Sequence, residues 1–139
     1  MKTNDKLILK QVTHDDIKFL YQILSERPRT VNISHKTMPS FYKHSKFVKS
    51  NPYVKWYVIH LNDVKIGSAY ITQINEITIH LIRKYENDKL KDEILTSIIK
   101  QNPHKRYIVN LNPKNKKGIE FYKKRGFKLV QYSYELLMD

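Results

Sequence analysis

The most informative part of the sequence lies near its C-terminus and reads Asn115-Lys116-Lys117-Gly118-Ile119-Glu120-Phe121-Tyr122-Lys123-Lys124-Arg125-Gly126-Phe127. The preceding Pro113-Lys114-Asn115 favours a helix start, because proline and asparagine suit the first positions of a helix. Ile119 and Tyr122 stand three residues apart with Phe121 beside them, so one face of this helix is apolar. Gly126 suits the left-handed residue that ends a helix. The stretch predicts a short amphipathic helix that carries two aromatic rings.

Predicted strands and helices alternate along the rest of the chain. Thr13 and Asp16 resemble a capping box, in which Asp16 replaces the usual Glu or Gln, and Pro28 ends the helix that follows. The apolar residues of that helix recur at helical spacing: Ile17, Leu20, Tyr21 and Leu24. Further helices are predicted after Pro39, over residues 90–99 and from residue 115. The predicted strands cover residues 7–9, 56–59, 64–74, 76–82, 107–109 and 128–136.

The middle of the chain predicts three antiparallel strands in a meander. Asn62-Asp63 and Asn75 are turn signals that separate the strands. The third strand alternates cleanly, with Ile77, Ile79 and Leu81 on one face and Glu76, Thr78 and His80 on the other. Gly67 interrupts the second strand and is compatible with a bulge. The whole order, β-α-(α)-β-β-β-α-β-α-β, indicates an α/β (α+β) fold with a mostly antiparallel sheet flanked by helices.

Composition limits the class of protein. The 139 residues are 40% hydrophobic and 12% aromatic, which predicts one globular domain over residues 1–139. A formal charge of +13 favours an anionic partner such as a polyphosphate cofactor, although lysines on a solvated surface are the alternative. The chain has no cysteine, which excludes disulfides and thiolate chemistry, and its histidines show no metal-binding spacing. We see no signal peptide or membrane span and expect a cytoplasmic protein.

The motif over residues 115–127, in this order of elements, resembles the GNAT N-acetyltransferase superfamily. The family pattern is an Asn, a small residue three positions later, an apolar residue, and then a Tyr followed by Gly-Phe. The resemblance covers residues 54–135 well and the first fifty residues in outline. It implies the GNAT fold, a mixed and mostly antiparallel sheet whose strands splay apart at the cofactor site. It also implies an acyltransferase that uses acetyl-CoA to acetylate a primary amine.

The resemblance further implies roles for individual residues. Tyr122 would be the general acid that reprotonates the departing thiolate of coenzyme A, and Asn115 would contact the pantetheine arm. Free backbone N–H groups near Leu81 and Ile82 would bind the thioester carbonyl and the pantetheine amide. The amine must lose a proton, and the candidate bases are Glu76 and His80, which share one strand face. For each of these side chains, the alternative is an ordinary structural role.

The resemblance also implies a pyrophosphate-binding loop at residues 86–91, but here the sequence departs from the family. The family places Gln or Arg first and small residues at the fourth and sixth positions, where this chain has Glu86, Lys89 and Lys91. We expect a lysine at a position that needs positive φ to be strained and to block close approach of a phosphate. The two ammonium groups would partly replace the backbone contacts as point charges. Asn87, Lys89 and Lys91 are therefore the candidate diphosphate contacts.

The sequence also bears on the acetyl acceptor and on alternative functions. Residues 75–79, 110–115 and 127–132, with His44, Phe47 and Trp56, are similar to acetyltransferases that act on nucleotide-linked amino sugars. A protein amine or another small amine is the alternative acceptor, and the sequence says nothing of oligomeric state. A second hypothesis is a degenerate GNAT domain that binds a partner without catalysis. A third is a nucleic-acid-binding protein, disfavoured because the lysines are dispersed and no recognised motif is present.

Overall fold

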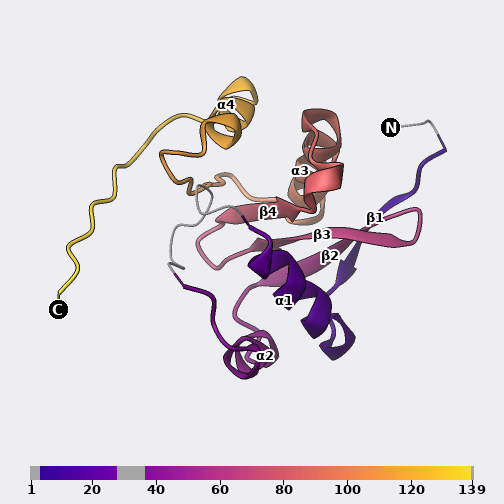
Figure 1. Ribbon diagram of the computed structural model, residues 1–139. Coiled ribbons are helices and arrows are strands. Elements are labelled where there is room, and N and C mark those ends of the chain that lie inside the picture. The colour runs from indigo at the N-terminus through magenta and orange to yellow at the C-terminus, as the bar shows by residue number, and fades with distance from the viewer. Residues whose placement is uncertain (1–3, 28–36, 139) are drawn as a thin grey trace.

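The computed structural model of this protein describes residues 4–27 and 37–138 (Figure 1). Its strands are β1 (Leu7–Gln11), β2 (Lys55–Leu61), β3 (Val64–Ile71) and β4 (Ile77–Leu81). Its α-helices are α1 (Ile17–Ser25), α2 (Phe41–Lys49), α3 (Asp88–Gln101) and α4 (Lys116–Lys124), and two short 3-10 helices cover His14–Asp16 and Arg83–Tyr85. No helix in these described ranges is long and apolar enough to cross a membrane.

The four strands form one antiparallel sheet in the order β1-β2-β3-β4. Asn62 and Asp63 turn the chain between β2 and β3 with φ of 51° and 66°, and Asn75 turns it before β4 with φ of 62°. Asparagine and aspartate tolerate this left-handed conformation better than most residues, so the turns predicted from the sequence are confirmed. The predicted meander is confirmed as well, although β3 ends at Ile71 rather than Ile74.

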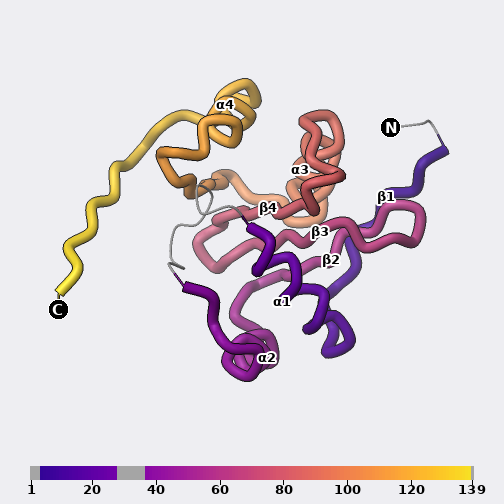
Figure 2. Tube along the Cα trace, in the orientation of Figure 1, coloured from indigo at the N-terminus to yellow at the C-terminus, as the bar shows by residue number. Residues whose placement is uncertain are grey.

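Helices cover both faces of the sheet, which gives three layers (Figures 1 and 2). On one face, α3 and α4 bury a large apolar cluster that includes Ile77, Ile79, Ile94 and Phe121. On the other face, α1 and α2 pack on β2 through a smaller cluster centred on Leu20, Val48 and Val58. The alternation of β4 explains the division, because Ile77 and Ile79 lie in the first cluster while the intervening residues point to the opposite side.

The capping box that starts the first helical segment is confirmed. The Thr13 N–H donates to Asp16 Oδ2 at 2.8 Å, and Lys65 Nζ lies 2.8 Å from the other oxygen of the same carboxylate. Burial alone would raise the pKa of Asp16, but the bonds from Lys65 and Thr13 outweigh burial and hold the pKa below its usual value. This cluster joins the start of α1 to β3. Pro28, predicted to end the helix, lies outside the described residues.

The predicted strand at residues 107–109 is reduced to a single parallel bridge. The Ile77 N–H donates to the Ile108 carbonyl at 2.9 Å, and the Ile108 N–H donates to the Asn75 carbonyl at 3.0 Å. The sheet is therefore mixed only at this point, where the chain passes β4 on its way to α4.

The prediction of a final strand at residues 128–136 is wrong for this chain taken alone. These residues extend away from the rest of the protein without joining the sheet, as the yellow end of Figure 1 shows. Their composition is that of a strand, but a strand also needs a neighbour with free N–H and C=O groups, and sequence does not report whether that neighbour is present.

Candidate active site

The pairing of β4 decides which of its backbone groups are free. The Ile82 N–H donates to the Ile66 carbonyl at 2.8 Å, and the Thr72 N–H donates to the Glu76 carbonyl at 3.0 Å. Even-numbered residues of β4 therefore hydrogen-bond toward β3, while the N–H and C=O groups of Ile77, Ile79 and Leu81 point to the other side. Beyond the bridge at Ile77, the described chain offers no hydrogen-bond partner to the Ile79 and Leu81 amides. We call these two residues the open edge of β4.

The open edge corrects one of the predicted donors. Leu81 has the free N–H that the sequence predicted, but the Ile82 N–H is already bonded to β3 and is not available. The second free donor is Ile79, two residues earlier, because free amides on a strand recur with a period of two. A correct choice from the sequence needed the register of β4 against β3.

Gly67 is placed opposite this edge for a steric reason. It pairs with Leu81, and a Cβ on Gly67 would lie 2.2 Å from the His80 carbonyl oxygen and 3.0 Å from the Leu81 Cα. A side chain at this position would push β4 away from β3. The register between β2 and β3 shifts beside Gly67: Ile59 pairs with Gly67 and His60 with Lys65, so Ile66 is an extra residue in β3. The bulge that the sequence allowed at Gly67 therefore lies in the same strand, one residue away.

Tyr122 lies on α4 and is 4% exposed. Its ring packs edge-on against Phe121 at a centroid distance of 5.0 Å and against Phe127 at 5.2 Å. It belongs to the same apolar cluster as Ile79, and Leu81 packs against that cluster. Burial raises the pKa of Tyr122, with a small opposing effect of Arg125, so the phenol stays protonated at neutral pH. The phenol is thus neutral in a residue that is almost wholly buried, and no hydrogen bond joins its O–H to another described residue.

Asn115 and Gly118 form the start of α4 as a unit. The Gly118 N–H donates to Asn115 Oδ1 at 3.0 Å, which makes Asn115 the N-cap of the helix. A Cβ on Gly118 would lie 2.6 Å from Asn115 Nδ2, so the cap requires glycine three residues later. The Asn-x-x-Gly spacing of the motif is explained by this contact. The amide nitrogen of Asn115 is left for a ligand, since the cap uses the oxygen.

Replacing Asn115 with Ala is expected to destabilise the protein by about 1 kcal/mol through loss of the cap. Asn115→Asp keeps an oxygen acceptor and adds a negative charge at the positive end of the helix dipole, so its stability should match that of the wild type. Urea unfolding of the two variants measures the difference. Equal destabilisation by both substitutions would argue against the cap.

The residues expected to bind diphosphate form an ordinary helix start. Asn87 caps α3 by accepting from the Leu90 N–H at 2.8 Å, and Lys89 and Lys91 are both helical. The non-glycine residues with positive φ in the described ranges are Asn51, Asn62, Asp63 and Asn75. The strain expected at Lys89 and Lys91 is therefore absent, because these positions need no left-handed backbone here.

The two lysines point in different directions. Lys89 is exposed, whereas Lys91 Nζ lies 4.7 Å from the ring centroid of Phe121 and 5.2 Å from that of Tyr122. Burial lowers the pKa of Lys91, against the opposing charges of Glu86 and Asp88. Lys91 thus joins α3 to α4 next to Tyr122. Its ammonium group does not lie at the start of α3, where it was expected to act as a point charge for the diphosphate.

Arg125 is a cation near this helix start that the sequence analysis missed. Its Nε lies 2.6 Å from Asp92 Oδ1, and its guanidinium stacks 3.6 Å from the ring centroid of Phe121. A longer contact of 3.4 Å joins it to the Asp88 carbonyl in the first turn of α3. The motif signals only the neighbouring Gly126, so the role of Arg125 in joining the two helices could not be read from spacing.

Glu76 and His80 lie on the same face of β4, as predicted. Glu76 Oε2 accepts from Asn110 Nδ2 at 2.5 Å, which ties the start of β4 to the segment after the bridge. His80 Nε2 is buried and has no hydrogen-bond partner in the described chain. Burial, with the positive charges of Arg27 and Lys91, lowers the pKa of His80 to about 3. His80 is therefore a neutral imidazole with one unused ring nitrogen.

The low pKa of His80 makes stability depend on pH. The unfolded chain binds a proton on this histidine below about pH 6.5, while the folded chain does not until about pH 3, so stability falls as pH falls through that window. Between pH 7.5 and pH 5 the expected loss is about 2 kcal/mol. Urea unfolding of the wild type and His80→Gln measures it, since the variant should lose less. His104→Gln, at an exposed position, should follow the wild type.

A group of aromatic residues and one arginine gathers beside His80. Tyr53 and Tyr70 stack at 3.7 Å with an interplanar angle of 2°, and Trp56 lies edge-on to Tyr53 at 4.8 Å. Arg27 Nε is buried without a hydrogen-bond partner, and burial lowers the pKa of Arg27 while the nearby Tyr70 and Tyr53 oppose this effect. We call Arg27, Tyr53, Trp56 and Tyr70 the aromatic–arginine cluster.

Only part of this cluster is signalled by the sequence. Trp56 is in it, and Phe47 packs edge-on against Trp56 at 6.0 Å. His44 instead packs against Tyr21 from α2, at 5.3 Å between ring centroids. Strand alternation could have added Tyr70, which pairs with Trp56 across the sheet, but nothing in the sequence marks Arg27.

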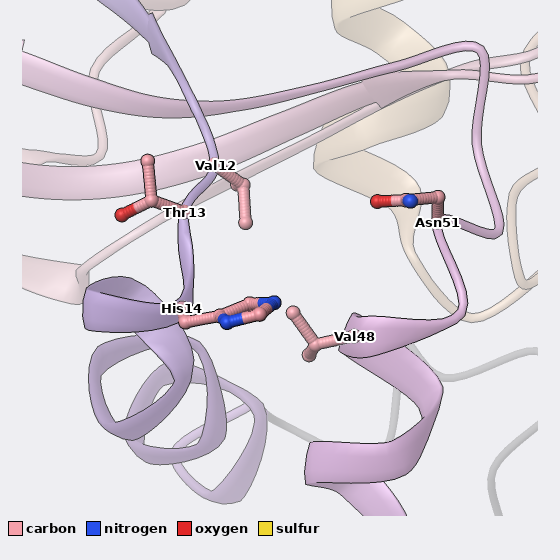
Figure 3. Close-up of a pocket in the computed structure, with 5 residues that line it drawn as sticks. All are labelled: Val12, Thr13, His14, Val48 and Asn51. Atoms are coloured by element: carbon pink, nitrogen blue, oxygen red, sulfur yellow. The ribbon is translucent and has the colours of Figure 1, made fainter.

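A separate open hollow of about 300 Å³ lies between the end of β1 and α2 (Figure 3). Val12, Thr13, His14, Val48 and Asn51 line it. None of the candidate catalytic or cofactor-binding residues lines it. In the ranges the structure describes, no three His, Asp or Glu side chains lie close enough together to hold a metal ion.

Known structures share this fold, although no protein-family model and no curated protein matches the sequence. A domain from Methanocaldococcus jannaschii aligns over 95% of this chain and 94% of its own, with a TM-score of 0.76 and 21% identity. The ribosomal-protein α-N-acetyltransferase RimL, solved with coenzyme A, aligns over 90% and 81% with a TM-score of 0.70 and 16% identity. Spermidine/spermine N-acetyltransferase SpeG from Vibrio cholerae aligns over 88% and 79% with a TM-score of 0.68 and 15% identity.

The fold is that of the GNAT acetyltransferases. The fold class predicted from the motif at residues 115–127 is thereby confirmed. The substrates named for these two GNAT enzymes are a ribosomal protein and polyamines, so neither supports the more specific resemblance to amino-sugar enzymes.

Proposed function

We propose that this protein is an acetyl-CoA-dependent N-acetyltransferase that acts on a primary amine. The observation that carries the proposal is the open edge of β4, beside the apolar cluster that contains Tyr122, where two backbone N–H groups have no partner among the described residues. Unpaired backbone donors of this kind suit the carbonyl of a thioester and the oxyanion that forms from it. The GNAT fold supports the same proposal, because a protein with this fold, RimL, was solved with coenzyme A bound.

The proposed reaction is a direct transfer. The neutral amine nitrogen attacks the thioester carbonyl carbon, a C–N bond forms, and the C–S bond breaks as the thiolate leaves. Ile79 and Leu81 donate to the oxyanion, and Tyr122 gives its proton to the thiolate. Glu76 is the favoured base for the proton that the amine loses. His80 is the weaker candidate, because a pKa of about 3 leaves it little affinity for a proton.

The proposed cofactor contacts divide between α3 and α4. Acetyl-CoA supplies the activated acetyl group, and the amide nitrogen of Asn115 is free to meet its pantetheine arm. The first-turn amides of α3 point toward the diphosphate position, although Asn87 already occupies the Leu90 N–H. Lys89 remains a candidate phosphate contact. Lys91 would reach the cofactor only by leaving the ring of Tyr122.

For the acceptor, we propose an amine that also carries negative charge, such as a nucleotide-linked amino sugar. The aromatic–arginine cluster supports this class, since stacked rings suit a base and a guanidinium whose buried Nε has no partner in the described chain suits a phosphate. The charge of +13 opposes a polycationic acceptor. Polyamines and protein N-termini are the competing acceptors in the test.

The test is release of free coenzyme A thiol from acetyl-CoA. Because the chain has no cysteine, a thiol reagent detects only the product. The acceptors are a 4-amino-sugar nucleotide, spermidine and a peptide with a free N-terminus. Turnover with the first supports the full proposal, and turnover with either of the others keeps the activity but overturns the acceptor. No thiol release with any amine, together with no calorimetric heat for acetyl-CoA, contradicts the enzyme.

The second candidate is a GNAT-fold domain that binds a partner without catalysis. It is favoured by one contact, the packing of Lys91 on the ring that should meet the thiolate. Calorimetry separates the two candidates, because the non-catalytic domain should give no heat with acetyl-CoA. Replacing Lys91 with Ala should then strengthen binding of acetyl-CoA if the enzyme proposal is correct and Lys91 merely covers the site.

A further inference from the structure

Lys91 is a half-buried side chain that the proposed reaction does not use. It lies in the first turn of α3, where its N–H donates to the Asn87 carbonyl at 3.1 Å, next to the buried Leu90. Lysine is rarely buried without a carboxylate partner, because desolvation of its charge is costly. In the part of the chain that the structure describes, no carboxylate forms an ion pair with Lys91. A salt bridge therefore does not explain why this lysine lies between two helices.

Side chains from two other elements surround the Lys91 ammonium group. On α4, its Nζ lies 4.7 Å from the ring centroid of Phe121 and 5.2 Å from that of Tyr122. On β4, burial lowers the pKa of His80, and the charge of Lys91 adds to this effect; His80 stands between the two residues of the open edge. Leu81 of that edge packs against the apolar cluster that contains Tyr122. The ammonium group therefore lies where α3, α4 and the open edge come together, close to the position proposed for the thioester.

The surroundings of Lys91 favour loss of its proton. Burial lowers its pKa, and the charge of Arg125 adds to this effect, while Glu86 and Asp88 oppose it. The two aromatic rings stabilise the ammonium form, so the neutral fraction stays small. A small fraction is sufficient, because an amine held next to a reacting carbon has an effective concentration far above that of a free amine. Lys91 therefore combines the two properties that attack on a thioester requires, a neutral form and a fixed position.

We propose that Lys91 is a self-acetylation site, which takes the acetyl group from the acetyl-CoA bound to its own chain. The inference rests on the proposed function, because it requires the thioester to lie at the open edge of β4. The long lysine side chain leaves the ring of Tyr122, and its neutral nitrogen attacks the thioester carbonyl carbon. A C–N bond forms and the C–S bond breaks. Tyr122 gives its proton to the thiolate and receives the proton that the nitrogen loses, so the products are Nε-acetyl-lysine and the free thiol of coenzyme A.

Self-acetylation differs from the catalysed reaction in its stoichiometry. The acetylated nitrogen of Lys91 is an amide, which is not a nucleophile and carries no charge. Each chain is therefore modified only once at this residue, whereas free amine molecules are acetylated one after another. The modification also removes the cation that packs on the ring of Tyr122.

The first test is release of coenzyme A thiol when the wild-type chain receives acetyl-CoA at neutral pH without any acceptor. Because the chain has no cysteine, a thiol reagent reports only this product. We expect a burst of about one equivalent of thiol per chain, and mass spectrometry of peptides should place the acetyl group on Lys91. Lys91→Arg keeps the positive charge and should lose the burst. Lys100→Arg, at an exposed position on the same helix, should keep it.

The second test separates the effect of the site from ordinary chemical acetylation. In the folded chain, Lys91 should be acetylated at least about 100-fold faster than Lys100, whereas in concentrated urea the two rates should be equal. The rate per chain should not depend on protein concentration, because each chain modifies itself. Equal rates in the folded chain, a burst that survives in Lys91→Arg, or a rate that rises with protein concentration overturns the proposal.

Failure of this inference can be told apart from failure of the proposed function. Continued turnover of a free amine by the wild type, with no acetyl group on Lys91, overturns the inference and leaves the proposed function standing. No calorimetric heat with acetyl-CoA, together with no thiol release in the presence or absence of an amine, overturns both.

Discussion

The Tyr122→Phe enzyme is expected to turn over at least about 100-fold more slowly than the wild type, because a positioned general acid contributes rate factors of that size. The substitution removes only the phenolic oxygen. The ring keeps its edge-on contacts with Phe121 and Phe127, so the site should keep its shape. The loss should therefore appear in kcat, while the affinity for acetyl-CoA measured by calorimetry stays within about twofold of the wild type.

A second tyrosine supplies the control for this result. Tyr107 donates its phenol O–H to the Asn102 carbonyl at 2.6 Å and accepts from the His104 N–H at 2.7 Å, so its oxygen is structural. Tyr107→Phe should lower the free energy of unfolding by about 1 kcal/mol or more and leave kcat of the folded enzyme unchanged. If Tyr122→Phe turned over as fast as Tyr107→Phe, the general-acid role would be wrong.

Replacing Gly67 with Ala is expected to damage both the sheet and the site. The added carbon would meet the His80 carbonyl oxygen at 2.2 Å, and backbone on both strands leaves it no room. Relief requires β3 and β4 to separate at the pair Gly67–Leu81, at a cost of about 1–3 kcal/mol or more. Because Leu81 carries one of the two free amides, binding of acetyl-CoA should be lost together with stability. Thermal unfolding and calorimetry measure the two effects.

Gly126 provides the matched substitution. A Cβ at Gly126 would meet nothing within 4 Å, but the residue has φ of 91°. Gly126→Ala should therefore cost about 1 kcal/mol from backbone strain alone and leave the affinity for acetyl-CoA unchanged. Similar losses of acetyl-CoA affinity in the two alanine variants would argue against a specific role of Gly67 at the open edge of β4.

Residue patterns predicted where the candidate site residues lie, but not what those residues contact. The pattern placed Tyr122 and Asn115 on one helix and Glu76 and His80 on one strand face, and the structure bears out both placements. It could not show that the Asn115 oxygen already caps its own helix. The same pattern predicted backbone strain at Lys89 and Lys91. Both residues have helical backbone, which lysine adopts without strain. Whether these side chains act in catalysis stays a prediction.

What the sequence determined by itself is local. The turns at Asn62-Asp63 and Asn75, the capping box at Thr13 and the glycine end of α4 each depend on interactions within a few residues. Such interactions are present wherever the same short stretch occurs, so they can be read from it.

Tertiary structure alone decided the rest, because the partners lie far apart along the chain. The free amides of Ile79 and Leu81 depend on the register with β3, and the direction of Lys91 depends on the rings of α4. Arg27 meets Tyr53 and Tyr70 only when three distant segments come together. Residues 128–138 have the local composition of a strand and still join no sheet, since hydrogen bonding between strands requires an edge that the local sequence does not supply.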